Sequence, residues 1–209
     1  MQVFCSAVRA KQWKKRRAER FLGIDFAMQG MCVFSTGEKA GYPMFYRKAE
    51  KKLAREQRKL SHCEKGSRNY QKQKKRVALC HEKIKNQRKD FQHKLSRELA
   101  ERYDAVCVED LNLKGMSRGL HLGKGVQDNG YGQFLSMLGY KLEERGKYLI
   151  KVDRYFASSR ICSVCGNKKK ELALSERVYV CECGNRMDRD VNAAVNIREE
   201  GKRIYTECA

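Results

Sequence analysis

Short runs of apolar, β-favouring residues occur at several places along the chain and predict strands. They lie at 20–27, 31–35, 105–109 and 148–152, and a further run at 44–46 predicts one more strand. The run at 105–109 is almost uniformly apolar and ends in an acid. That pattern is typical of a buried central strand, so we expect a sheet that includes this segment at its centre.

A second pattern predicts helices. Between 47 and 103 the apolar residues recur at the spacing of one helix face, and Gly66-Ser67 interrupts this pattern, which indicates a helical hairpin. Segments 133–145 and 190–197 also carry apolar residues at helical spacing. Strands and helices together place the chain in the α/β class, with the hairpin inserted after the early strands.

Charge changes this picture, because the chain of 209 residues is strongly basic. It has 46 Lys and Arg against 25 Asp and Glu, which gives a formal net charge of +21. A balance of this sign indicates a polyanionic partner. No apolar run reaches the roughly 18 residues of a membrane span, and a basic rather than apolar stretch follows the N-terminus. We therefore expect no membrane association and no signal peptide.

The basic residues gather in two places. Residues 1–19 form a basic tail, for which a solvated tail and a nucleic-acid contact are both open interpretations. The predicted hairpin at 47–103 carries 20 Lys and Arg against 7 Asp and Glu. A charged helix face most often only faces solvent, but this one-sided sign favours contact with a nucleic-acid backbone. The candidate contact residues are Lys48, Lys51, Lys52, Arg55, Lys72, Lys74, Lys75 and Arg76.

The ten cysteines divide into six isolated residues and one cluster. The cluster consists of Cys162-Ser-Val-Cys165 and, fifteen residues later, Cys181-Glu-Cys183, with a glycine after each pair. Two thiolate pairs at this separation can close a tetrahedral zinc site. Because four cysteines leave no open coordination position, we expect the zinc to be structural. Disulfides or coincidence are the alternatives, and a chain without an export signal makes disulfides unfavourable.

Three acids form a second candidate constellation. Asp25 lies inside an apolar strand, Glu109 ends another strand, and Asp190 begins a helix. Taken singly, Asp190 could be a helix N-cap and Glu109 could merely mark a strand end. An acid inside a core strand is costly unless it is paired or binds a metal. If the three converge, their oxygens suit Mg²⁺ or Mn²⁺, and two such ions can promote cleavage of a phosphodiester.

Four segments carry a resemblance to a known family. They are Gly23-Ile-Asp25, the stretch at 46–60, Val108-Glu-Asp-Leu-Asn112, and the stretch at 151–197 with its motifs at 158–166 and 188–197. In this order they resemble the transposon-encoded TnpB (OrfB) family, and the resemblance covers residues 20–200.

The resemblance implies a RuvC-like, RNase H-like nuclease domain with an inserted zinc ribbon and an RNA-guided cut of DNA. It implies Asp25, Glu109 and Asp190 as the catalytic acids that hold Mg²⁺ or Mn²⁺. Asp188 is a weaker candidate, for a place next to these metal ligands. The implied zinc ligands are Cys162, Cys165, Cys181 and Cys183. The implied partners are DNA and a guide RNA. The implied location is the cytoplasm of a prokaryote, in association with the nucleoid.

The expected domain boundaries follow from these motifs. They are a tail at 1–19, a nuclease domain at 20–157 plus 186–202, a zinc ribbon at 158–185 and a C-terminal tail at 203–209. Family members usually carry a sizeable portion before the first catalytic Asp, whereas Asp25 stands near the start of this sequence. We therefore expect an N-terminally truncated copy or a nuclease-domain fragment.

Two rival functions remain open from the sequence. In the first, the chain is a truncated remnant that binds nucleic acid through the hairpin and ribbon without cleaving it. In the second, it is a zinc-stapled structural protein, which fits poorly with the net charge of +21.

Overall fold

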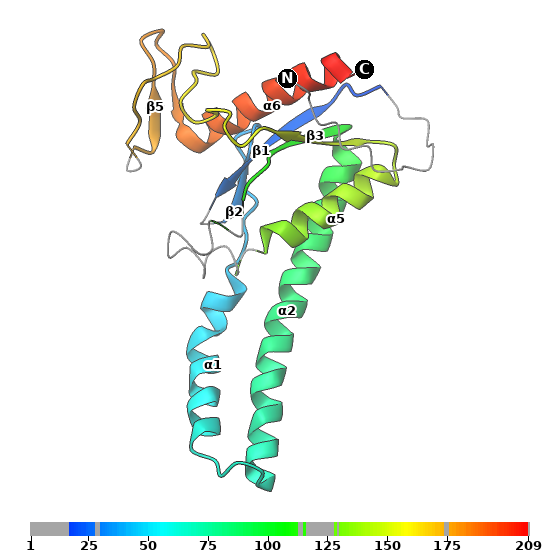
Figure 1. The fold of residues 1–209 in the computed structure, drawn as a ribbon, viewed down its shortest axis with the longest axis vertical. Coiled ribbons are helices and arrows are strands. Elements are labelled where there is room, and N and C mark those ends of the chain that lie inside the picture. Colours follow the sequence, from blue (N-terminus) through cyan, green and yellow to red (C-terminus); the bar gives the residue numbers. More distant parts are fainter. Residues whose placement is uncertain are drawn as a thin grey trace.

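A mixed four-stranded sheet forms the centre of the fold (Figure 1). The computed structural model describes residues 17–27, 30–112, 115, 128, 130–173 and 176–208. The strands are β1 (Phe21–Ala27), β2 (Met31–Phe34), β3 (Ala105–Glu109) and β4 (Tyr148–Val152), in the order β2-β1-β3-β4. Strand β2 is antiparallel to β1, whereas β1, β3 and β4 are parallel. The four strand segments at 20–27, 31–35, 105–109 and 148–152 are confirmed.

The two faces of the sheet are covered by different helices (Figure 1). Helix α2 (Arg68–Arg102) and helix α5 (Tyr131–Glu143) cover one face, where Ile24 and Val108 are buried with Leu99 and Phe134. Helix α6 (Arg189–Cys208) covers the other face, where Cys107 packs with Ile197. Because successive strand residues point to opposite faces, each strand contributes alternate residues to each layer.

Glycines let α6 approach the sheet closely. A Cβ atom at Gly23 of β1 would lie 2.0 Å from the carbonyl oxygen of Ala194, and one at Gly201 would lie 2.2 Å from the Sγ of Cys107. Neither space admits a side chain. Gly23 therefore seats the first half of α6 directly on β1, two residues before Asp25.

The helical hairpin is confirmed. Helix α1 (Phe45–Ser61) precedes α2, and the two run together away from the sheet (Figure 1). Gly66 adopts φ 89°, a left-handed conformation that glycine tolerates. The Ser67 hydroxyl then caps α2 by accepting a hydrogen bond from the backbone N–H of Tyr70 at 3.1 Å.

The strand predicted at 44–46 is wrong, because α1 begins at Phe45. Tyr42 and Phe45 are three residues apart, and both contact the ring of Phe91 on α2 at centroid distances of 5.4 and 6.3 Å. These aromatic residues favour strands in isolation, but here their packing against α2 selects the helix.

Two elements extend across the expected domain boundaries, which stay a prediction. Strand β5 (Val178–Val180) pairs antiparallel with β6 (Arg186–Asp188), on the two sides of the boundary expected after residue 185. Helix α6 continues through residues 203–208, which were expected as a tail. Arg203 forms ion pairs with Glu200 and Glu207 along this last part of the helix, which favours its continuation.

Residues 1–16 of the expected basic tail lie outside the described residues. Within the part that is described, no helix is long and apolar enough to span a membrane.

Candidate metal centres

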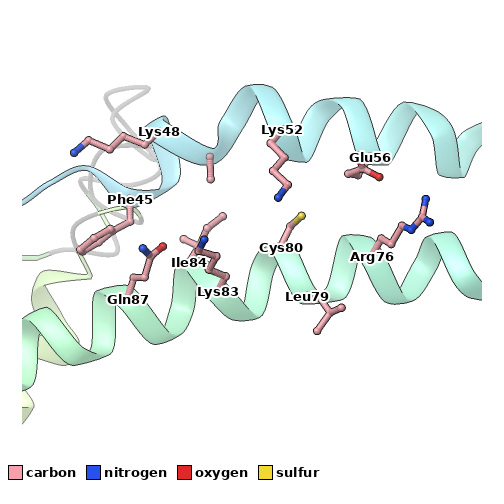
Figure 2. Close-up of a pocket in the computed structure, with 11 residues that line it drawn as sticks. Phe45, Lys48, Lys52, Glu56, Arg76, Leu79, Cys80, Lys83, Ile84 and Gln87 are labelled. Atoms are coloured by element: carbon pink, nitrogen blue, oxygen red, sulfur yellow. The ribbon is translucent and has the colours of Figure 1, made fainter.

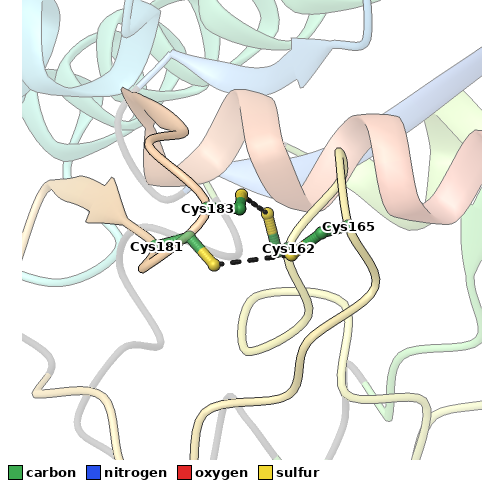
Figure 3. A group of neighbouring side chains, drawn as sticks. All are labelled: Cys162, Cys165, Cys181 and Cys183. Carbon is green, nitrogen blue, oxygen red and sulfur yellow. Dashed lines mark hydrogen bonds between the residues drawn. The ribbon is translucent and has the colours of Figure 1, made fainter.

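The four cysteines of the ribbon come together in the geometry of a tetrahedral site (Figure 3). Their sulfur atoms all lie within 4.8 Å of one another. The Sγ atoms of Cys162 and Cys183 are 3.7 Å apart, and those of Cys165 and Cys181 are 3.6 Å apart. A tetrahedron with Zn–S bonds of about 2.3 Å has edges of about 3.8 Å. The donor set and its spacing therefore fit zinc.

Both cysteine pairs lie in turns that close at a glycine, despite their different spacing. The backbone N–H of Gly166 donates to the carbonyl of Cys162 at 2.9 Å, and that of Gly184 donates to the carbonyl of Cys181 at 3.0 Å. The two glycines have φ values of 75° and 89°. Each glycine thus supplies the left-handed residue that closes its turn, and the second turn is one residue shorter.

Local hydrogen bonds favour the thiolate form of Cys162. Burial raises the pKa of the Cys162 thiol, but the backbone N–H groups of Cys165 and Val164 and the Asn185 side chain outweigh it and lower the pKa to about 6. The Asn185 amide donates to the Cys162 Sγ at 3.4 Å and so joins the two turns. A thiolate at neutral pH is the form that binds zinc.

The three acids converge at one end of the sheet, on the face that α6 covers. In the parallel pairing of β1 with β3, Ile24 is opposite Val108, so the next residues of the two strands, Asp25 and Glu109, follow side by side. Asp25 shares the side of β1 that carries Gly23, which contacts α6. Asp190 lies in the first turn of α6.

Burial and mutual repulsion dominate the electrostatics of this acid site. The pKa of Asp25 is raised well above its usual range by burial, by Glu109 and by Asp190, while Arg189 opposes the shift. Burial also raises the pKa of Glu109, and the hydroxyl of Ser158, which donates to its carboxylate, opposes this. A cation among these carboxylates would remove both penalties, so the oxygen donors fit a hard divalent ion.

The acid site is looser than the cysteine site. Among the residues that the structure describes, only the four cysteines form a group of three or more metal-binding side chains whose ligand atoms all lie within 4.8 Å. The carboxylates of Asp25, Glu109 and Asp190 are neighbours that interact through their charges. They do not form a cluster of that tightness.

The N-cap of α6 is Asp188, which removes the alternative that Asp190 is only a helix N-cap. Its Oδ1 accepts hydrogen bonds from the backbone N–H groups of Asp190 at 2.9 Å and Val191 at 3.3 Å, which is the contact pattern of a helix N-cap. Asp188 therefore caps α6, and the carboxylate of Asp190 is left to the acid site.

Two residues near the acids were missed in the sequence. The Nε of Arg189 lies 3.9 Å from the Oδ1 of Asp190, and its guanidinium donates to the carbonyl of Ala173 at 3.1 Å. The hydroxyl of Ser158 reaches Glu109. Arg189 stands between Asp188 and Asp190 in the motif at 188–197, whereas nothing in the sequence places Ser158 beside Glu109.

The candidate basic residues of the hairpin are all exposed. Three of them, Lys48, Lys52 and Arg76, line a groove of about 700 Å³ between α1 and α2 (Figure 2). Lys52 and Arg76 point into the space between the helices, over apolar side chains that include Ile84 (Figure 2). The remaining candidates, Lys51, Arg55, Lys72, Lys74 and Lys75, lie on the hairpin outside the groove.

Comparison with family models decides the family. The OrfB_IS605 model, described as "Probable transposase", matches residues 4–119, which is more than half of the chain. The chain belongs to the OrfB family. A second model, "Cas12f1-like, TNB domain", matches residues 131–197 and so contains the cysteine site, Asp190 and the first part of α6. The family predicted from the sequence is confirmed.

Curated relatives of this OrfB chain carry names that describe a nuclease. A Streptomyces pristinaespiralis protein named "Putative RNA-guided DNA endonuclease" is 38% identical over 86% of this chain and 45% of its own length. The Escherichia coli K12 protein "Putative RNA-guided DNA endonuclease InsQ" is 31% identical over 88% of this chain and 49% of its own length. The OrfB chain thus spans about half the length of these relatives.

Solved structures confirm the fold. The protein in a structure titled "Cryo-EM structure of the Cas12f1-sgRNA-target DNA complex" matches 89% of the OrfB chain with a TM-score of 0.60 and 21% identity, and the match covers 51% of that protein. A "CRISPR-Cas12f Ternary Complex" matches 90% of the chain with the same TM-score and 22% identity. The α/β architecture with its ribbon is therefore a Cas12f-like fold.

Proposed function

We propose that this OrfB chain contains the DNA-cleaving site of an RNA-guided endonuclease, with Asp25, Glu109 and Asp190 as its catalytic acids. The observation that carries the proposal is the convergence of these partly buried carboxylates from β1, from the end of β3 and from the start of α6, where Glu109 and Asp190 both oppose ionisation of Asp25. Such an arrangement is unfavourable for folding alone, because each ionised carboxylate raises the energy of the others. The relatives named as RNA-guided DNA endonucleases supply independent support.

In this proposal the three carboxylates hold Mg²⁺ or Mn²⁺. When bound, two such ions activate a water molecule and stabilise the leaving oxygen of a phosphodiester. Asp25 on β1, Glu109 on β3 and Asp190 on α6 would hold these ions through their carboxylate oxygens. Asp25 is partly buried, and the Nε of Arg189 lies 3.9 Å from the Oδ1 of Asp190, where its charge favours the ionised carboxylate.

The proposal gives the zinc ion of the cysteine site a structural role. Cys162, Cys165, Cys181 and Cys183 hold it, and their four thiolates fill its coordination sphere. No position is left for a substrate. The ribbon residues next to these turns instead contact α6, which carries Asp190.

DNA and a guide RNA are the proposed partners. The exposed hairpin cations supply phosphate contacts, and the groove between α1 and α2 offers Lys48, Lys52 and Arg76 beside an apolar surface. Contacts of this kind are independent of base sequence and weaken steeply with salt.

A cleavage assay tests the proposal. The chain, with single- or double-stranded DNA and Mg²⁺ or Mn²⁺, is compared with Asp25→Asn, Glu109→Gln and Asp190→Asn. Asp110→Asn is the matched control, because Asp110 is the exposed neighbour of Glu109 and pairs with Lys151 at 3.2 Å. We expect metal-dependent cutting that the three site variants abolish and the control retains.

The rival function predicts another result. The basic hairpin exists independently of the acids and favours binding without cleavage. If none of the metals supports cutting while salt-sensitive binding is retained, the chain is a nucleic-acid-binding remnant and the nuclease proposal fails.

A further inference from the structure

A buried hydrogen-bonded path joins the acid site to the base of the ribbon. It begins at Glu109, whose carboxylate accepts a hydrogen bond from the hydroxyl of Ser158. Ser158 is buried and comes immediately after the loop that follows β4. The strand pairing of β1 with β3 fixes the backbone of Glu109 relative to that of Asp25, and the close seat of α6 at Gly23 brings Asp190 near them, whereas the hydrogen bond from Ser158 acts on the Glu109 carboxylate itself.

Two asparagines of α6 hold the segment that contains Ser158. The side-chain amide of Asn196 donates to the carbonyls of Ser158 at 2.7 Å and Ile161 at 2.6 Å. The amide of Asn192 also donates to Ile161 at 2.7 Å, and its oxygen accepts from the backbone N–H of Ser163 at 3.0 Å.

The contacts of the two asparagines form one hydrogen-bond network between α6 and this segment. Asn192 and Asn196 are four residues apart, so they share one face of α6, and both are buried. Buried amides require partners, and here the partners are Ser158 and Ile161, which precede the first cysteine turn, and Ser163 within that turn. The helix that carries Asp190 therefore holds the segment that reaches Glu109.

We propose that Ser158 is a positioning residue, which holds the carboxylate of Glu109 in register with Asp190 because Asn192 and Asn196 fix Ser158 to α6. The proposal rests on the proposed function, since it concerns the same acid site. In this proposal Ser158 acts through the carboxylate of Glu109. Without its hydroxyl, the Glu109 carboxylate is free to rotate and loses a charge-assisted hydrogen bond.

The test measures metal affinity rather than cleavage alone. Mn²⁺ is titrated by calorimetry and by electron paramagnetic resonance into the chain and into Ser158→Ala, Ser158→Thr and Ser159→Ala. Ser159 is the matched control, because it is the adjacent serine and undergoes the same change. Zinc content and thermal unfolding report on the ribbon and the fold of every variant.

We expect Ser158→Ala to bind Mn²⁺ about 10- to 100-fold more weakly, as is usual when an outer partner of a metal ligand is removed. Ser158→Thr keeps the hydroxyl and recovers most of the affinity, and Ser159→Ala behaves as the parent chain. All variants retain one zinc per chain. If Ser158→Ala fails to fold, Ser158→Cys, which keeps a similar volume but donates weakly, takes its place with the same expected direction.

Three results would overturn the proposal. Equal Mn²⁺ affinity in Ser158→Ala and the parent chain removes the positioning role and leaves the proposed function standing. An equal loss in Ser159→Ala shows a general effect of the segment. If the parent chain itself binds no Mn²⁺, the acid site fails as a metal site, and the positioning proposal fails with it.

Discussion

The cysteine site and the acid site lie at the two ends of one hydrogen-bonded path, but they obtain their geometry from different ranges of the chain. The cysteines all come from residues 162–183, in two turns that each close on their own backbone. The carboxylates come from residues 25, 109 and 190, and they meet only because β1, β3 and α6 pack together.

The charges of the two sites are also handled differently. Local N–H groups stabilise the thiolate of Cys162 and lower its pKa to about 6, despite burial. At the acid site burial and neighbouring carboxylates raise the pKa of Asp25, so ionisation there is opposed. Local hydrogen bonds thus favour the charged form of one proposed zinc ligand, Cys162, whereas a cation would be needed to offset the repulsion that Asp25 meets at the acid site.

The largest expected effect is on zinc affinity, and it follows from removing one thiolate of the cysteine site. We expect Cys181→Ser to lower zinc affinity by more than about 100-fold, because even an outer partner of a metal ligand is worth 10- to 100-fold. Zinc content after dialysis against a chelator measures it. Cys208→Ser, at an exposed cysteine far along α6, is the control and retains its zinc. Equal zinc loss in both variants would contradict the four-cysteine site.

The second effect has opposite signs for activity and stability. Asp25→Asn should lower the cleavage rate by about 10²- to 10⁴-fold, since a bound metal supplies several kcal/mol to the transition state. In Mg²⁺-free buffer the same change removes a repelling charge and raises Tm, by about 2–4 °C for each kcal/mol gained. Calorimetry of both proteins checks the sign. A lower Tm for Asp25→Asn would show that the contacts of this carboxylate stabilise the fold more than its repulsion destabilises it.

The third effect is a pH dependence that the acid site alone should show. Asp25 and Glu109 have raised pKa values in the folded chain, so the folded state holds protons that the unfolded state releases above about pH 4. Without divalent ions, the free energy of unfolding therefore falls as pH rises from that range through the folded-state pKa values. Asp25→Asn should flatten the dependence. Denaturant unfolding across pH, with zinc retained, measures it, and identical curves would contradict it.

The smallest effect tests whether the hairpin acts independently of both metal sites. Lys52→Gln should weaken nucleic-acid binding for all sequences and reduce the slope of log affinity against log salt by about 1. Zinc content and Mn²⁺ affinity should stay unchanged. Lys39→Gln provides a control, because Lys39 lies off the hairpin and pairs with Asp188 at 3.7 Å. An unchanged salt slope in Lys52→Gln would remove this lysine from the phosphate contacts.

The sequence by itself determined the structural features that depend on residues close together along the chain. The hairpin break at Gly66-Ser67, the apolar strand at 105–109 and the two cysteine turns all follow from local spacing and backbone preferences, and the structure contains them. The strand predicted at 44–46 failed where distant packing against Phe91 overrode local preference.

Only the tertiary structure decided which acids meet and what surrounds them. The sequence could not show that Asp188 caps α6 and leaves Asp190 to the acid site, nor that Ser158 reaches Glu109 across 49 positions of the chain. Such contacts depend on the register of parallel strands and on the close seat of α6 at Gly23. Both are set by packing between distant segments, which no local pattern encodes.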